Sequence, residues 1–186
     1  MSARPVLALL LACSLLPGCA SWFAKREPSL PAYQPVDPAS LTVNTRMALA
    51  AKAVELAIDE FALQHNDRVP GPDSLVRTLT KNGFLDDNQL PRNPFARDRS
   101  PVHVLPALVG DNDPLLTEPA PALTAGDMFD RWQGAAMPGT VLVLLTLDRQ
   151  KFRVFGVGQY GSRPAIVYGP ASLMHPAVRD ELKITR

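Results

Sequence analysis

The side chains in this sequence that are best suited to covalent modification are two thiols, Cys13 and Cys19. Both lie within the first 19 residues, and the rest of the chain has no cysteine. If this first segment is processed, the folded part has neither an intramolecular disulfide nor a thiolate metal site. The thiol chemistry of this chain is therefore expected at its N-terminal end.

The other candidates for chemistry are scattered along the chain. His65, His103 and His175 each lack a second ligand at metal spacing, so we expect surface or helix-end positions for them. Ser162 and Ser172 carry no local mark of a nucleophile, and no Gly-x-Ser-x-Gly, phosphate-loop or His-Glu-x-x-His motif is present. We predict no enzyme activity, no catalytic residue, no metal and no cofactor.

The acidic residues are candidates for binding calcium and for a hydrolase site. Asp111-Asn112-Asp113 offers oxygen ligands for calcium, but the glycine and distal glutamate of a calcium loop are missing, so a solvated loop is expected. Asp86-Asp87 is expected to be polar turn sequence. An envelope hydrolase remains an alternative if His103 converges with Asp111 or Asp127 in a pocket.

Composition favours one ordinary globular domain. The chain has 186 residues, 46% of them hydrophobic and 20% charged, with a formal net charge of +1. Balanced charge provides no basic field for nucleic acid, so no such partner is expected.

Cys19 ends a segment with the layout of an export signal. Arg4 precedes an apolar run from Pro5 to Leu16, which at about 12 residues is too short to span a bilayer but suits a signal-peptide core. The run ends in Leu16-Pro17-Gly18-Cys19, which resembles the lipobox of bacterial lipoproteins. The resemblance implies a signal peptide at 1–18 and lipid on Cys19. An ordinary secretory signal or an uncleaved interfacial segment is the alternative.

Lipid on Cys19 would make the membrane a partner of this chain, since each buried methylene contributes about 0.8 kcal/mol. Ala20 stands where an aspartate would resemble an inner-membrane retention signal, so the resemblance implies the outer membrane, with the domain facing the periplasm. Residues 19–40 form a predicted tether of roughly 60 Å at most, because closely spaced prolines favour an extended chain.

Residues 41–186 are predicted to form an α+β domain with a long amphipathic helix on a small antiparallel sheet. The helix is expected over Leu41–Asn66 and a shorter, side-chain-capped one from Asp73 or Ser74 to Lys81, ending before Gly83. The expected strands are Val102–Leu108, confined to an edge by Pro106, then Thr140–Leu147, Phe152–Val157 and Ala165–Tyr168. Short helices are expected over 125–133 and 176–184.

The order of these elements resembles the globular part of type IV pilins and of the major pseudopilins of type II secretion. The residues that carry the resemblance are Asn66-Asp67-Arg68-Val69-Pro70, Ser74-Leu75-Val76, Gly83-Phe84-Leu85, Leu90-Pro91-Arg92-Asn93-Pro94-Phe95 and the strand and turn from Phe152 to Gly161. It implies a secretion or pilus apparatus as partner.

Two departures limit what is carried over from that family. No long apolar helix of the kind that builds the filament follows Cys19. The loop Gly158–Arg163 has no carboxylate, so the calcium site of the pseudopilins is not expected.

Met128, Phe129 and Trp132 have helical spacing and are either core or an anchor for a partner. We therefore expect an envelope lipoprotein that acts as a structural or interaction module. A hydrolase, or a lipoprotein that binds a small ligand or peptidoglycan, is the alternative.

Overall fold

The computed structural model describes residues 41–85, 90–98, 100–116 and 124–183. Cys19, the tether and Asp86-Asp87 lie outside this part. The α-helices are α1 (Val43–Gln64), α2 (Leu75–Lys81), α3 (Ala125–Arg131) and α4 (Pro176–Glu181), and the strands are β1 (His103–Val109), β2 (Thr140–Thr146), β3 (Phe152–Tyr160) and β4 (Arg163–Tyr168). Short 3₁₀ turns lie at Pro72–Ser74, Pro114–Leu116, Gln133–Ala135 and Ala171–Leu173.

The four strands form one mixed sheet in the order β1-β2-β3-β4. The β2–β3 and β3–β4 pairs are antiparallel as expected, but β1 runs parallel to β2. The prediction of a purely antiparallel sheet is therefore wrong. Parallel neighbours need a long crossover, and the connection between β1 and β2 includes α3 and two 3₁₀ turns. The α+β class, and the edge position of the strand that contains Pro106, are confirmed.

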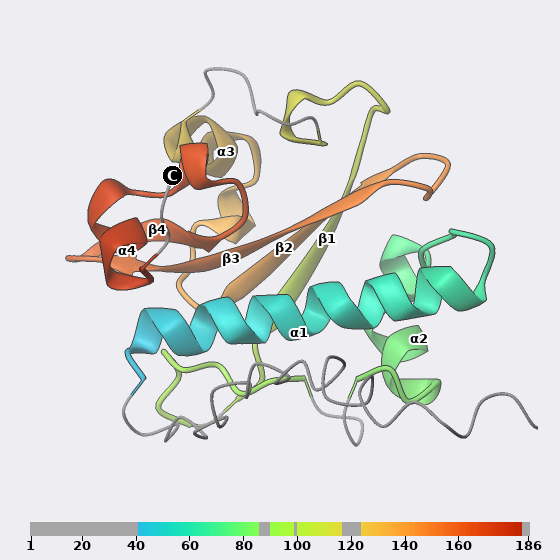
Figure 1. Ribbon diagram of the computed structural model, residues 1–186, viewed down its shortest axis with the longest axis horizontal. Coiled ribbons are helices and arrows are strands. Elements are labelled where there is room, and N and C mark those ends of the chain that lie inside the picture. The colour runs from blue at the N-terminus through green and yellow to red at the C-terminus, as the bar shows by residue number, and fades with distance from the viewer. Residues whose placement is uncertain (1–40, 86–89, 99, 117–123, 184–186) are drawn as a thin grey trace, which may run out of the picture. The chain divides into compact units, whose positions relative to one another are not determined.

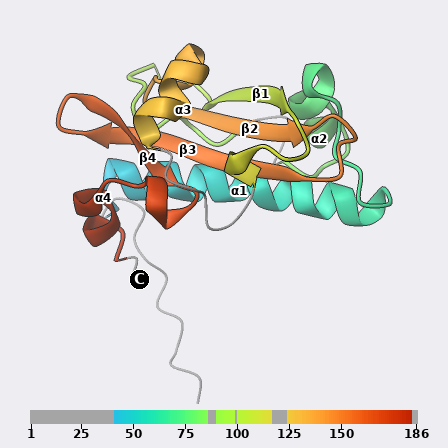
Figure 2. The same cartoon turned by 90° about the horizontal axis from the view of Figure 1, so that it is seen from above.

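The sheet lies between helices on its two sides. In Figure 1, α1 runs beneath the strands and α3 lies above them. Figure 2 shows α1 alongside β3, away from β1, in agreement with its contacts to β3 and β4. All seven residues of β2 are buried, as its almost wholly apolar sequence predicts for a strand covered on both faces.

Local sequence accounts for the ends of the first two helices. The Thr42 side chain accepts a hydrogen bond from the backbone N–H of Thr45, so α1 begins at Val43, two residues after the expected start at Leu41. Asn66 and Asp67 adopt left-handed backbone angles (φ 54° and 57°), which end the helix. The expected side-chain cap of α2 is wrong: Ser74 makes no capping bond, because its hydroxyl donates to the Gly71 carbonyl instead.

Two glycines of β3 allow α1 to pack closely against the sheet. A Cβ atom at Gly156 would lie 2.8 Å from the Cβ of Ala51, and one at Gly158 would lie 2.4 Å from Oδ1 of Asn44. Real side-chain atoms do not approach so closely, so the spacing of α1 and β3 requires glycine at both positions.

Asn44 joins the start of α1 to the end of β3. Its Nδ2 donates to the backbone carbonyl of Gln159 (2.9 Å), and its Oδ1 accepts from the backbone N–H of the same residue (3.0 Å). Nδ2 also donates to Oε2 of Glu181, in α4 (2.9 Å). One amide side chain thus binds both backbone groups of Gln159, as a neighbouring strand would, and fixes the position of the helix along β3.

We expect Gly156→Ala to lower the free energy of unfolding by about 1–3 kcal/mol, because the added methyl group forces α1 away from β3. Gly110→Ala is the matched control: nothing lies within 4 Å of a Cβ there, and the substitution should leave stability unchanged or raise it slightly. Urea unfolding followed by tryptophan fluorescence measures both. Equal midpoints for the two variants would contradict the close contact.

Candidate functional site

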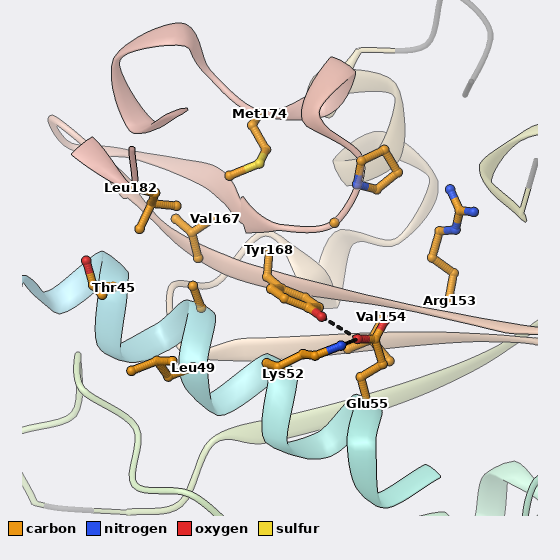
Figure 3. Close-up of a pocket in the computed structure, with 13 residues that line it drawn as sticks. Thr45, Leu49, Lys52, Glu55, Arg153, Val154, Val167, Tyr168, Met174 and Leu182 are labelled. Carbon is orange, nitrogen blue, oxygen red and sulfur yellow. Dashed lines mark hydrogen bonds and ion pairs between the residues drawn. The ribbon is translucent and has the colours of Figure 1, made fainter. Parts of the chain in front are cut away.

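A hollow of about 460 Å³ opens beside α1, where β4 ends. Figure 3 shows side chains of α1, β3 and the chain after β4 pointing towards it. The β3–β4 ladder reaches only to the pair Gly156–Tyr168, so β2 is the strand partner of Phe152–Phe155. Pro170 follows closely and has no N–H to donate, which prevents β4 from continuing along β3. The hollow occupies the space beyond this end.

Three polar side chains meet in this hollow. Nζ of Lys52 lies 2.5 Å from Oε2 of Glu55, one turn further along α1. The hydroxyl of Tyr168, the last residue of β4, donates to the same carboxylate oxygen. The Lys52 ammonium also lies 6.0 Å from the centre of the Tyr168 ring. This Lys52–Glu55–Tyr168 network connects α1 to β4, the edge strand opposite β1. Ala48, Leu49 and Met174 supply apolar surface around it.

The network shifts the ionisation of two of its members. Burial, and next the hydrogen bond to Glu55, raise the pKa of Tyr168 from 10.0 to about 12. The hydrogen bond to Glu55 also raises the pKa of Lys52 above its usual 10.5. At neutral pH Lys52 is therefore an ammonium and Tyr168 a neutral phenol, and Arg153 also lines the hollow. An apolar hollow with a few polar groups suits the binding of a small molecule with an apolar body and a polar end.

Sequence patterns gave little indication of this site. In the sequence, Lys52 and Glu55 are only two charged residues outside the apolar stripe of the helix. Their i, i+3 spacing predicts an ion pair, but no local pattern links them to Tyr168, which is more than a hundred residues away.

A second hollow, of about 600 Å³, is lined by Ser162, Ser172 and His175 among others. The His175 ring stacks on Tyr160, with 3.9 Å between centroids, and its Nδ1 accepts a hydrogen bond from the backbone N–H of Ala177. In the described part of the chain no hydrogen bond joins this ring to either serine hydroxyl. His175 caps α4, consistent with the helix-end position expected for it.

The structure places the residues proposed for a hydrolase site on different elements: β1, the loop after it, and α3. His103 begins β1 and Asp111 follows its far end, so the strand of seven residues separates them. Asp127 is exposed and bonded to Thr124 in a capping box, which lowers its pKa. His65 stacks on Phe61 at the end of α1, with 3.8 Å between ring centroids. Among the described residues, no side-chain hydrogen bond or ion pair joins His103 to Asp111 or Asp127.

Asp113 corrects the prediction of a fully solvated loop at 111–113. Asp111 and Asn112 are exposed, but Asp113 is buried and its Oδ2 lies 2.6 Å from the guanidinium of Arg131 in α3. Its Oδ1 accepts from the backbone N–H of Leu115 (3.0 Å). The pair holds the chain after β1 against α3. Within the described ranges, no cluster of three or more His, Cys, Asp or Glu side chains could hold a metal ion.

The structure separates the three residues considered as a partner anchor. Met128 is buried in the core, which excludes its side chain from a surface contact. Phe129 and Trp132 are partly buried and pack against the core. The Arg131 guanidinium lies 4.5 Å from the centre of the Trp132 ring. A partner contact at Phe129 and Trp132 stays a prediction.

This arrangement defines an α+β domain with a mixed four-stranded sheet and a polar network at the end of β4. No protein-family model, curated protein or solved structure matches the chain. Among the described helices, none is both long and apolar enough to cross a bilayer.

The raised pKa of Tyr168 predicts a loss of stability in base. A phenol with a higher pKa in the folded state stabilises the fold fully below pH 10.0, and this contribution disappears as the pH rises through about 12. Between pH 10 and 12 the wild-type protein should therefore lose more stability than Tyr168→Phe. Urea unfolding at successive pH values measures this loss.

Absorbance titration at the phenolate band gives an independent check of the same network. The difference between the wild-type and Tyr168→Phe titrations should have its midpoint near pH 12. Glu55→Gln should lower this midpoint, because the carboxylate no longer favours the neutral phenol. A midpoint at 10 in the wild-type protein would contradict the network.

Proposed function

We propose that this protein is a lipid-anchored module of the bacterial cell envelope that works by binding other proteins. The observation that carries the proposal is Leu16-Pro17-Gly18-Cys19 at the end of an apolar run of signal-peptide length. Lipid on Cys19 holds the chain at a membrane, which we infer to be the outer membrane. The proline-rich residues 20–40 then let the domain extend into the periplasm.

The order of elements supports a pseudopilin-like architecture as part of this proposal. α1 is followed by α2, by Gly83 in a left-handed conformation (φ 75°), and later by the β2–β3–β4 meander. Between them, the backbone N–H of Asn93 donates to the Ser100 carbonyl and that of Val102 to the Pro91 carbonyl, closing a loop. The parallel strand β1 and its crossover are additions to the pattern. A secretion or pilus apparatus is the partner class that this resemblance favours.

Metabolic labelling with an alkyne-bearing fatty acid tests the anchor. Cells that make the full chain should incorporate the label into the protein, and Cys19→Ser should abolish labelling and leave the signal segment uncleaved. Cys13→Ser is the matched control, because it removes the other thiol from the same segment and should be labelled like the wild type. Labelled Cys19→Ser, or an unlabelled wild type in cells that lipidate a known lipoprotein, would refute the proposal.

The hollow beside α1 favours a second candidate function, the binding of a small envelope ligand such as a peptidoglycan fragment. Its support is an apolar concavity that contains the convergent polar groups of Lys52, Glu55 and Tyr168. Calorimetric titration with soluble peptidoglycan fragments tests it. Binding should be lost in Ala48→Phe, which fills the hollow, and weakened in Tyr168→Phe. No heat of binding for the wild-type protein would exclude this class of ligand.

A further inference from the structure

The outward face of α1 carries a second regular pattern besides the one buried against the sheet. Its exposed positions, together with the cap residue Thr42, include a series at alternating steps of four and three, which is the spacing of a coiled-coil seam. The residues at these positions are Thr42, Arg46, Leu49, Ala53, Leu56, Glu60 and Leu63. Leucine recurs at every seventh residue of this seam from Leu49 to Leu63.

These leucines face solvent in the single chain. Leu49, Leu56 and Leu63 are 55%, 53% and 79% exposed, although the opposite side of the same helix is fully buried. A row of exposed leucines along one helix marks an interaction surface more than isolated ones would. Ala53, between the first two leucines, leaves room for a second helix to approach closely.

Charge along this outward face points to the occupant. Near the start of α1 the face carries the exposed cation Arg46, and near the end it carries the exposed acidic residues Asp59 and Glu60. Lys52 does not add to this pattern, because it is paired with Glu55 at the hollow. This distribution opposes the helix dipole, which favours acidic residues near the start and basic residues near the end. It does not, then, serve to stabilise α1 by itself. It is, however, complementary to a copy of itself that runs in the opposite direction.

We propose that the outward face of α1 is an interface between two copies of this chain, packed antiparallel about a two-fold axis near Ala53 and Leu56. The leucines of each helix cover those of the other, and Arg46 of one helix lies near Asp59 and Glu60 of its partner. A parallel pair would align like charges, which the antiparallel pair avoids. The interface does not depend on lipid at Cys19. An experiment that disproves the dimer therefore does not disprove the lipid anchor, and the reverse also holds.

Thiol crosslinking in intact cells tests this geometry with the full chain. No cysteine lies beyond residue 19, so a cysteine introduced in α1 is the only thiol of the folded part. A short thiol-specific crosslinker should give a dimer with Ala53→Cys. Arg46→Cys alone should not, because the two copies of this position would be about 25 Å apart. Two co-expressed copies, one with Arg46→Cys and the other with Leu63→Cys, should crosslink.

Leu147→Cys is the matched control, because this leucine is equally exposed (69%) but lies in the turn after β2. It should give no dimer, and neither should the chain without an added cysteine. Efficient self-crosslinking of Arg46→Cys would show a parallel pair and overturn the proposal. Absence of a dimer with both Ala53→Cys and Leu56→Cys would overturn it as well, in favour of a different occupant for this face.

Charge reversal supplies an independent measurement. In the Ala53→Cys background, Arg46→Glu or Glu60→Arg alone should reduce the dimer band severalfold, because each places like charges opposite one another twice. The double variant should restore the band, since the complementary pattern returns with its signs exchanged. Both residues are exposed, so neither substitution should unfold the single chain. A double variant as poor as the singles would contradict the antiparallel pairing.

Discussion

The rest of this structure depends on how closely α1 approaches β3. Glycine at positions 156 and 158 removes the side chains that would hold the helix away from the sheet, and Ala51 lies directly against the first of them. Asn44 then fixes the helix along the strand by binding both backbone groups of Gln159. Close packing of this kind sets distance and register together, because any shift of the helix brings a larger side chain onto a glycine.

The candidate site is a consequence of that placement. α1 runs past the end of β4, where the ladder stops before Pro170, and the space beyond this end is lined by the helix on one side and by β3 on the other. Lys52 and Glu55 face this space because they lie one turn apart on the flank of the helix. Tyr168 reaches them from the edge strand. The polar network therefore depends on the same close contact between α1 and the sheet that the glycines make possible. Any ligand bound there would contact both α1 and the sheet.

Local patterns were sufficient where neighbouring residues decide the structure. The end of α1 before Asn66, the turn at Gly83 and the burial of β2 all follow from residues within one or two turns of the feature. The direction of β1 does not follow from local sequence. Its residues could pair with β2 in either a parallel or an antiparallel direction, and only the course of the connection between the two strands decides which. The burial of Asp113 likewise depends on Arg131, which α3 supplies from eighteen residues further along the chain.

The sequence by itself therefore determined the amphipathic helix, the buried strand and the turns between them, because each depends on periodicity or on a short motif. Tertiary structure alone decided that β1 pairs parallel with β2, that Lys52, Glu55 and Tyr168 share one hollow, and that three leucines of α1 remain outside the core. The physical reason is the same in each case. Contacts between segments far apart in the chain depend on how the helix and strands pack, and packing is set by glycines and an asparagine whose effect is visible only in the assembled fold.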